Sequence, residues 1–80
     1  MQYSVYILYS VSCDVYYKGF SVDVEKRLQD HLLGKSKFTS RVRDWVLLYQ
    51  KTFDSKTAAL IEERRLKKLN RTSIEKIISG

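Results

Sequence analysis

The chain has 80 residues, which predicts one domain over residues 1–80, because a second hydrophobic core would not fit. A single cysteine excludes an internal disulfide, and one cysteine with one histidine excludes a structural zinc site of about four such ligands. The formal charge of +6 favours an anionic partner such as nucleic acid. With no signal peptide and no apolar run long enough to span a bilayer, we expect a cytoplasmic protein without a membrane partner.

Two stretches rich in tyrosine and β-branched residues predict a pair of strands. The first runs from about Tyr3 to Tyr9 and the second from about Val15 to Phe20, with a polar turn between them. A hairpin centred near Val11–Ser12 would place Tyr6 opposite Tyr17. A register slip of two residues would still leave both tyrosines on one face of the sheet, because side chains alternate with period two.

The next predicted element is an amphipathic helix. Ser21 is its expected N-cap, and Gly34 suits the position just beyond its last turn. An apolar stripe recurs at every fourth residue, namely Val24, Leu28 and Leu32. Arg27 and His31 lie one helical turn apart on the flank of this stripe, so we expect their side chains to be neighbours.

A loop rich in basic residues then leads to a third strand at about Trp45–Phe53. Asp54 or Ser55 is expected to cap a second helix that runs to about Leu69, and the pair Thr72–Ser73 is expected to begin a short last helix. The order β-β-α-β-α-α predicts an α+β fold, in which helices flank a three-stranded antiparallel sheet.

Four segments in this order carry a family resemblance. They are Val5-Tyr6-Ile7, Tyr17-Lys18-Gly19, Glu25–His31 and Ala59-Leu60-x-x-Glu63-x-x-Leu66. Together they resemble the GIY-YIG nuclease superfamily, closest to its small single-domain bacterial members and similar to the N-terminal nuclease domain of bacterial excinucleases. The resemblance covers roughly Met1 to Ile78 and implies the same order of strands and helices. Ser4 and Lys18 depart from the family pattern, but neither replaces a reactive group.

The resemblance implies roles for five side chains. Tyr6 and Tyr17 would position or deprotonate the attacking water, Arg27 would bind the scissile phosphate, and His31 would donate a proton or contact the phosphate. Glu63 would bind a single Mg²⁺ or Mn²⁺ ion, completed by phosphate oxygens and water. The alternative interpretation is that the tyrosines are ordinary strand residues and that the charged side chains are solvated helix residues.

Two neighbouring glutamates compete for the metal. The apolar face of the second long helix is centred on Ala58, Ala59, Leu66 and Leu69. Glu62 lies more squarely on that face, where a carboxylate would be buried at a cost, whereas Glu63 lies at its edge and can reach a cleft. Glu63 is therefore the predicted ligand, and Glu62 is the alternative.

A tyrosine can act as a base only if its pKa falls. Half-ionisation at neutral pH requires a fall from ~10 to ~7, which corresponds to ~4 kcal/mol. One cation about 4 Å away supplies roughly that amount at an effective dielectric constant of ~20. Arg27 or a bound divalent ion would serve, and without the metal we expect the phenol to stay protonated.

Two basic clusters suit a phosphate backbone. The first lies in the loop before the third strand and contains Lys35, Lys37, Arg41 and Arg43. The second lies at the end of the second long helix and includes Lys67 among Arg64, Arg65, Lys68 and Arg71. Clusters of this kind predict binding to DNA, including branched or damaged DNA, with an affinity that falls as salt rises.

The first functional hypothesis is a metal-dependent endonuclease that hydrolyses DNA phosphodiester bonds, with structure-specific cleavage in repair or recombination as its expected use. The alternative is a nucleic-acid-binding module that keeps the nuclease fold without cleaving. A third hypothesis is an interaction domain whose basic surface docks on an acidic protein. A chain of this size holds a catalytic core and little else, so a protein partner would supply specificity.

Overall fold

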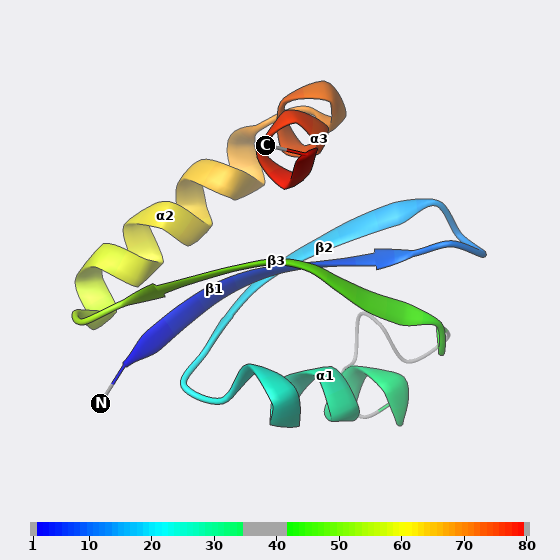
Figure 1. Cartoon of the computed structure of the whole chain (residues 1–80), viewed down its shortest axis with the longest axis horizontal. Helices are drawn as coiled ribbons and strands as arrows, with labels where there is room; N and C mark the ends of the chain where they lie inside the picture. Colours follow the sequence, from blue (N-terminus) through cyan, green and yellow to red (C-terminus); the bar gives the residue numbers. More distant parts are fainter. Residues whose placement is uncertain (1, 35–41, 80) are drawn as a thin grey trace.

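The structure is a computed structural model that describes residues 2–34 and 42–79. Its elements follow one another in the predicted order β-β-α-β-α-α (Figure 1). The strands are β1 (Tyr3–Ser10), β2 (Val15–Ser21) and β3 (Trp45–Phe53). The helices are α1 (Val24–Leu32), α2 (Lys56–Lys68) and α3 (Arg71–Ser79). The predicted α+β fold is thereby confirmed.

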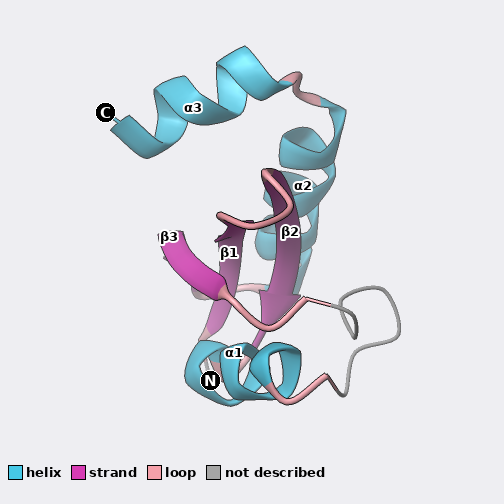
Figure 2. Ribbon diagram, turned by 90° about the vertical axis from the view of Figure 1, so that its right-hand side faces the viewer, coloured by secondary structure: helices cyan, strands magenta, loops and turns pink. Residues whose placement is uncertain are grey.

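The three strands form one antiparallel sheet in the order β2-β1-β3. Helix α1 lies on one side of this sheet, whereas α2 and α3 lie on the other, and the turned view of Figure 2 separates α1 from α3 clearly. Strand β1 is in the centre, which explains its almost unbroken apolar sequence, because both of its faces are covered.

The alternation of side chains along β1 divides the core into two clusters. The cluster on the α2 and α3 side contains Val5, Ile7, Ala59, Leu66 and Ile74. The cluster on the α1 side contains Tyr6, Leu8, Val24 and Trp45. Successive strand residues point to opposite faces, so Tyr6 belongs to the second cluster although both of its neighbours in sequence belong to the first.

The N-cap of the first helix lies two residues later than predicted. Asp23 is the N-cap, and its carboxylate accepts a hydrogen bond of 3.1 Å from the backbone N–H of Lys26. Ser21 is the last residue of β2, and its hydroxyl accepts from the backbone N–H of Asp23 at 2.9 Å. The prediction of Ser21 as N-cap is therefore wrong, because Ser21 shapes the turn that precedes the cap.

The caps of the other two helices also use short polar side chains. Ser55, one of the two predicted caps of α2, accepts from the N–H of Ala58 at 3.1 Å. Helix α3 begins at Arg71, slightly earlier than predicted, because the Asn70 side-chain oxygen accepts from the N–H of Ser73 at 2.9 Å. Ser73 is thus the residue whose N–H is capped, and it does not begin the helix.

A β-bulge in β3 changes which face its residues occupy. Tyr49 pairs with Ile7, but Leu47 pairs with Leu8, so Leu48 is an extra residue in the ladder. An extra residue reverses the alternation of side chains beyond it. Consequently Tyr49 packs on the α2 side of the sheet, whereas Leu47 and Trp45 pack on the α1 side.

Candidate active site

The two tyrosines of the hairpin lie on the same face of the sheet, as their parity predicts. In the observed register Tyr6 pairs with Gly19 and Tyr17 pairs with Leu8, so the predicted pairing of Tyr6 with Tyr17 is wrong by two residues. A shift of two residues preserves the face, and the two ring centroids are 6.4 Å apart. Tyr6 is 1% exposed and Tyr17 is half-buried, so only Tyr17 has appreciable contact with solvent.

Gly19 creates the space into which the Tyr6 phenol extends. A Cβ atom on Gly19 would lie 2.5 Å from both Cζ and the hydroxyl oxygen of Tyr6. No side chain fits there, because contacts under 3.0 Å are not seen for real Cβ atoms. The phenol tip therefore passes directly over the backbone of β2, and the glycine of the Tyr17-Lys18-Gly19 segment is what allows it to do so.

His31 is wholly buried against these tyrosines. Its Nε2 atom lies 3.2 Å from the Tyr6 hydroxyl oxygen, and its ring centroid is 4.7 Å from that of Tyr17. Burial lowers the pKa of His31, and the nearby positive charge of Arg27 lowers it further, so the imidazole is neutral at pH 7. The sequence placed His31 on the flank of the apolar stripe, but α1 is rotated so that His31 and Val24 face the sheet.

Arg27 lies one turn before His31 and is more accessible, with 38% of its side chain exposed. Its guanidinium lies 3.8 Å from the Asp30 carboxylate and is close enough to the Tyr6 hydroxyl for its charge to act on that phenol. Burial raises the pKa of Tyr6 and outweighs the influence of Arg27, which acts in the opposite direction. Arg27 alone therefore does not ionise Tyr6, and the phenol stays protonated at neutral pH.

The two glutamates of α2 have different surroundings. Glu62 accepts two hydrogen bonds from Arg65, at 2.5 and 3.1 Å, and lies near Tyr49 on the other side of β1 from Tyr6. Glu63 is 17% exposed, lies 3.7 Å from the Lys67 ammonium, and is close enough to Tyr6 for its charge to contribute to the raised pKa of that phenol. Of the two glutamates, Glu63 is therefore the one whose charge acts on Tyr6.

These oxygen atoms are compatible with a single hard cation. Within residues 2–34 and 42–79, no group of three or more histidine, cysteine, aspartate or glutamate side chains is arranged to hold a metal. A single carboxylate such as Glu63 suits Mg²⁺ or Mn²⁺, which bind through one or two carboxylates and take their other ligands from water and phosphate. A single metal shared with a phosphorylated substrate, with Glu63 as its protein ligand, therefore stays a prediction.

The predicted phosphate-binding residues have separate outcomes. Lys35, Lys37 and Arg41 lie outside the described residues. Arg43 is exposed, and its guanidinium lies over Gly34, where a Cβ atom would be 2.7 Å from the guanidinium carbon. This position is just beyond the C-terminal turn of α1, where the helix dipole favours a cation.

Three members of the second basic cluster are already in ion pairs. Lys67 pairs with Glu63, Arg65 pairs with Glu62, and Arg71 pairs with Asp14 at the tip of the hairpin. Arg71 also lies over the ring of Tyr16, 5.3 Å from its centroid, and so connects α3 to the hairpin. Arg71 therefore serves the fold, which the sequence did not indicate.

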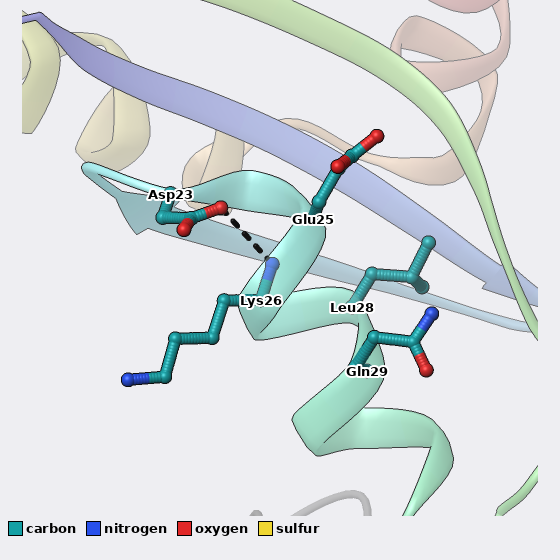
Figure 3. A pocket seen from close by; sticks show the side chains of 5 residues that line it. All are labelled: Asp23, Glu25, Lys26, Leu28 and Gln29. Carbon is teal, nitrogen blue, oxygen red and sulfur yellow. Dashed lines mark hydrogen bonds between the residues drawn. The ribbon is translucent and has the colours of Figure 1, made fainter.

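A hollow in the protein surface is lined by none of the predicted site residues. It is lined by Asp23, Glu25, Lys26, Leu28 and Gln29, along the first turns of α1 (Figure 3). The hollow follows the N-terminal turns of a helix and holds no buried polar group, so we do not assign it a function.

The comparisons with known proteins agree with this geometry. The family model described as the GIY-YIG catalytic domain matches residues 2–77. This chain belongs to the GIY-YIG family. It is 33% identical to a UPF0213 protein of Natronomonas pharaonis, covering 90% of this chain and 88% of that protein. It is 37% identical to a UPF0213 protein of Staphylococcus saprophyticus, covering 90% of this chain and 92% of that protein.

A solved structure supports the same assignment. The solution NMR structure of a UPF0213 protein from Bacillus halodurans matches with a TM-score of 0.64 and 32% identity, covering 99% of this chain and 84% of that one. A GIY-YIG catalytic domain implies nuclease chemistry on nucleic acid, and nucleases of this kind generally use a divalent metal. The names of these relatives state no activity, so the function of this chain must be argued from its site. No helix within the described residues is long and apolar enough to cross a membrane.

Two residues beside the tyrosines had no site role in the sequence-based prediction. In the sequence, Gly19 belongs to the family motif, and a glycine inside a strand also indicates close approach by another group. Trp45 directly follows a basic loop, which does not indicate its contact with the tyrosines. Its ring centroid lies 6.2 Å from that of Tyr17 and 6.3 Å from that of His31. Only the bulge in β3 accounts for this position.

Proposed function

We propose that this chain is a metal-dependent endonuclease that hydrolyses phosphodiester bonds in DNA. The observation that carries the proposal is the environment of the Tyr6 hydroxyl. His31 lies 3.2 Å from it, and the charges of Arg27 and Glu63 both act on it, within a GIY-YIG catalytic domain. An accessible cation, a carboxylate and phenol groups in one place are the parts that phosphodiester hydrolysis needs.

The candidate side chains differ in burial, and we assign their roles accordingly. Tyr17 is half-buried and is assigned to position the attacking water, because it has contact with solvent. Tyr6 is buried and protonated, and we assign it to help position Arg27, whose charge acts on its hydroxyl. Arg27 would bind the phosphate and stabilise the negative charge that develops on it.

His31 and Glu63 complete the proposed machinery. His31 is wholly buried and neutral, so we assign it to orient the Tyr6 hydroxyl, and a direct contact with the phosphate would require His31 to become exposed. Glu63 would hold the Mg²⁺ or Mn²⁺ ion. The ion would supply positive charge to the phosphate and lower the pKa of bound water.

The alternative is a nucleic-acid-binding module that does not cleave. The observation that favours it is the burial of the Tyr6 phenol, which leaves Tyr17 as the only one of the two phenols with solvent contact. Both proposals predict DNA binding that weakens with salt, by ~0.9 log units for each phosphate neutralised. Only the first predicts a cleaved product that depends on metal.

The test uses two neighbouring glutamates as site variant and control. Glu63→Gln and Glu62→Gln are assayed with Mg²⁺ or Mn²⁺ on a panel of flapped, nicked and branched DNA. Glu63→Gln should lose cleavage and keep DNA binding, because it removes the metal ligand alone. Glu62→Gln should cleave like the wild type, since Glu62 lies against Arg65. Cleavage by Glu63→Gln at the wild-type rate would refute the assignment.

A further inference from the structure

One buried donor beside the proposed site has no partner in the protein. Trp45 is 6% exposed, and its indole nitrogen is buried without a hydrogen-bond partner. Among the described residues, this is the one buried side-chain nitrogen or oxygen in that condition. Unpaired buried donors are rare in native proteins because each forfeits its hydrogen bonds to water, so this one needs an explanation.

The surroundings of Trp45 place it with the candidate catalytic residues. Its ring lies 6.2 Å from Tyr17 and 6.3 Å from His31, measured between centroids. The bulge at Leu48 directs it to this face, and bulges often redirect a side chain next to an active site. Asp44, the preceding residue, is anchored to the hairpin by accepting from the Ser10 hydroxyl at 2.7 Å, which restricts the backbone that carries the indole.

We infer that Trp45 is a substrate-binding residue of this site, and that its indole N–H donates to a non-bridging oxygen of a bound phosphodiester. This inference rests on the proposed function and adds a binding residue to it. A phosphate oxygen is the expected acceptor, because an indole N–H without a protein partner can donate to a negatively charged oxygen of the substrate. The indole nitrogen is buried in the free protein, so a neighbouring side chain, such as the half-buried Tyr17, must move on binding.

The chain offers a direct spectroscopic test, because it contains one tryptophan and therefore gives one indole N–H signal. The ¹⁵N-labelled protein is titrated with a short flapped DNA duplex, without divalent metal, at low salt. The indole proton should move downfield as the hydrogen bond forms, with the same concentration dependence as the backbone signals of Arg27. Because a hydrogen bond to a charged group contributes more binding free energy than one between neutral groups, Trp45→Phe should weaken DNA binding by about tenfold to a hundredfold.

Trp45→Phe keeps an aromatic ring beside Tyr17 and His31, and its thermal unfolding is compared with that of the wild type. Tyr49→Phe is the matched control, because Tyr49 is on the same strand and packs on the opposite face of the sheet. This control should bind DNA like the wild type. If Trp45→Phe does not fold, the signal of the wild-type indole still decides the question.

Two results would overturn the inference and leave the proposed function standing. One is an indole signal that stays in place while backbone signals move with DNA. The other is an indole signal that is already far downfield in the free protein and is unchanged by DNA. Such a signal would show that a buried water accepts the hydrogen bond of the indole N–H. If no signal moves at any DNA concentration at low salt, nucleic-acid binding itself is refuted, and the proposed function fails with the inference.

Discussion

Replacing Gly19 by alanine tests whether the position of the Tyr6 hydroxyl matters for activity. The new Cβ atom would lie 2.5 Å from Cζ and from the hydroxyl oxygen of Tyr6, whereas ordinary van der Waals contact begins at 3.4 Å. The phenol must retreat by about 1 Å, and a misplacement of that size at a catalytic group costs up to about a hundredfold in rate. The hydrogen bond to His31, already 3.2 Å long, would break.

The cost in stability should be smaller than the cost in activity. Forcing one methyl group into a packed site typically costs ~1–3 kcal/mol in the free energy of unfolding. Urea unfolding of Gly19→Ala gives this quantity, and cleavage of a flapped DNA with Mg²⁺ gives the rate. We expect a folded variant with a cleavage rate lowered by about 10²-fold.

The Tyr6→Phe background shows which group transmits the effect. Tyr6→Phe removes the hydroxyl and keeps the ring, so Gly19→Ala should cost much less activity in this background than in the wild type. The loss of stability should remain, because Cζ still collides with the new methyl group. Equal losses of activity in both backgrounds would refute the reasoning, since the hydroxyl would then not transmit the effect.

The other predictions concern the phenols, the buried imidazole and the ion pair at the proposed metal ligand. Tyr17→Phe should lower the cleavage rate by ~10²–10⁴, whereas Tyr16→Phe, on the other face of the sheet, should change it little; equal losses would contradict the parity argument. The pKa of His31 is lowered in the folded protein, so just below pH ~6.5 the imidazole is protonated in the unfolded chain but not in the folded one. The free energy of unfolding should therefore fall as pH drops from ~6.5 toward the lowered pKa. His31→Phe should flatten this dependence in urea unfolding, and an unchanged slope would show that another group causes it. Lys67→Met should tighten Mn²⁺ binding by about two- to fivefold, measured by electron paramagnetic resonance, because the Lys67 ammonium competes with the metal for Glu63. Lys67→Arg keeps the charge and should bind Mn²⁺ as the wild type does. Equal effects of the two variants would exclude charge as the cause.

Several features of the site follow from local sequence patterns. The common face of Tyr6 and Tyr17 was predictable because strand side chains alternate with period two. The predicted register is wrong by two residues, but a shift of two leaves both tyrosines on the same face. The spacing of Arg27 and His31 was predictable from the helical repeat. Ser55 was recognisable as a cap because short polar side chains satisfy the free N–H groups at a helix start.

Other features depend on how elements far apart in the sequence meet. The bulge at Leu48 reverses the alternation within β3 and brings Trp45 to Tyr17, and a strand sequence does not reveal an extra residue in its ladder. The helical wheel left Glu62 and Glu63 as alternatives, and the docking of α2 brings the charge of Glu63 to act on Tyr6 and that of Glu62 to act on Tyr49.

The sequence by itself determined the order of strands and helices, the shared face of the two tyrosines and the membership of the family, because these depend on periodicity and motif within short segments. Only the tertiary structure decided that Tyr6 and His31 are buried together and that the pKa of Tyr6 is raised despite Arg27. Burial and electrostatics depend on every element packed around a group, and for these residues that packing joins β1, β2 and α1 across the chain.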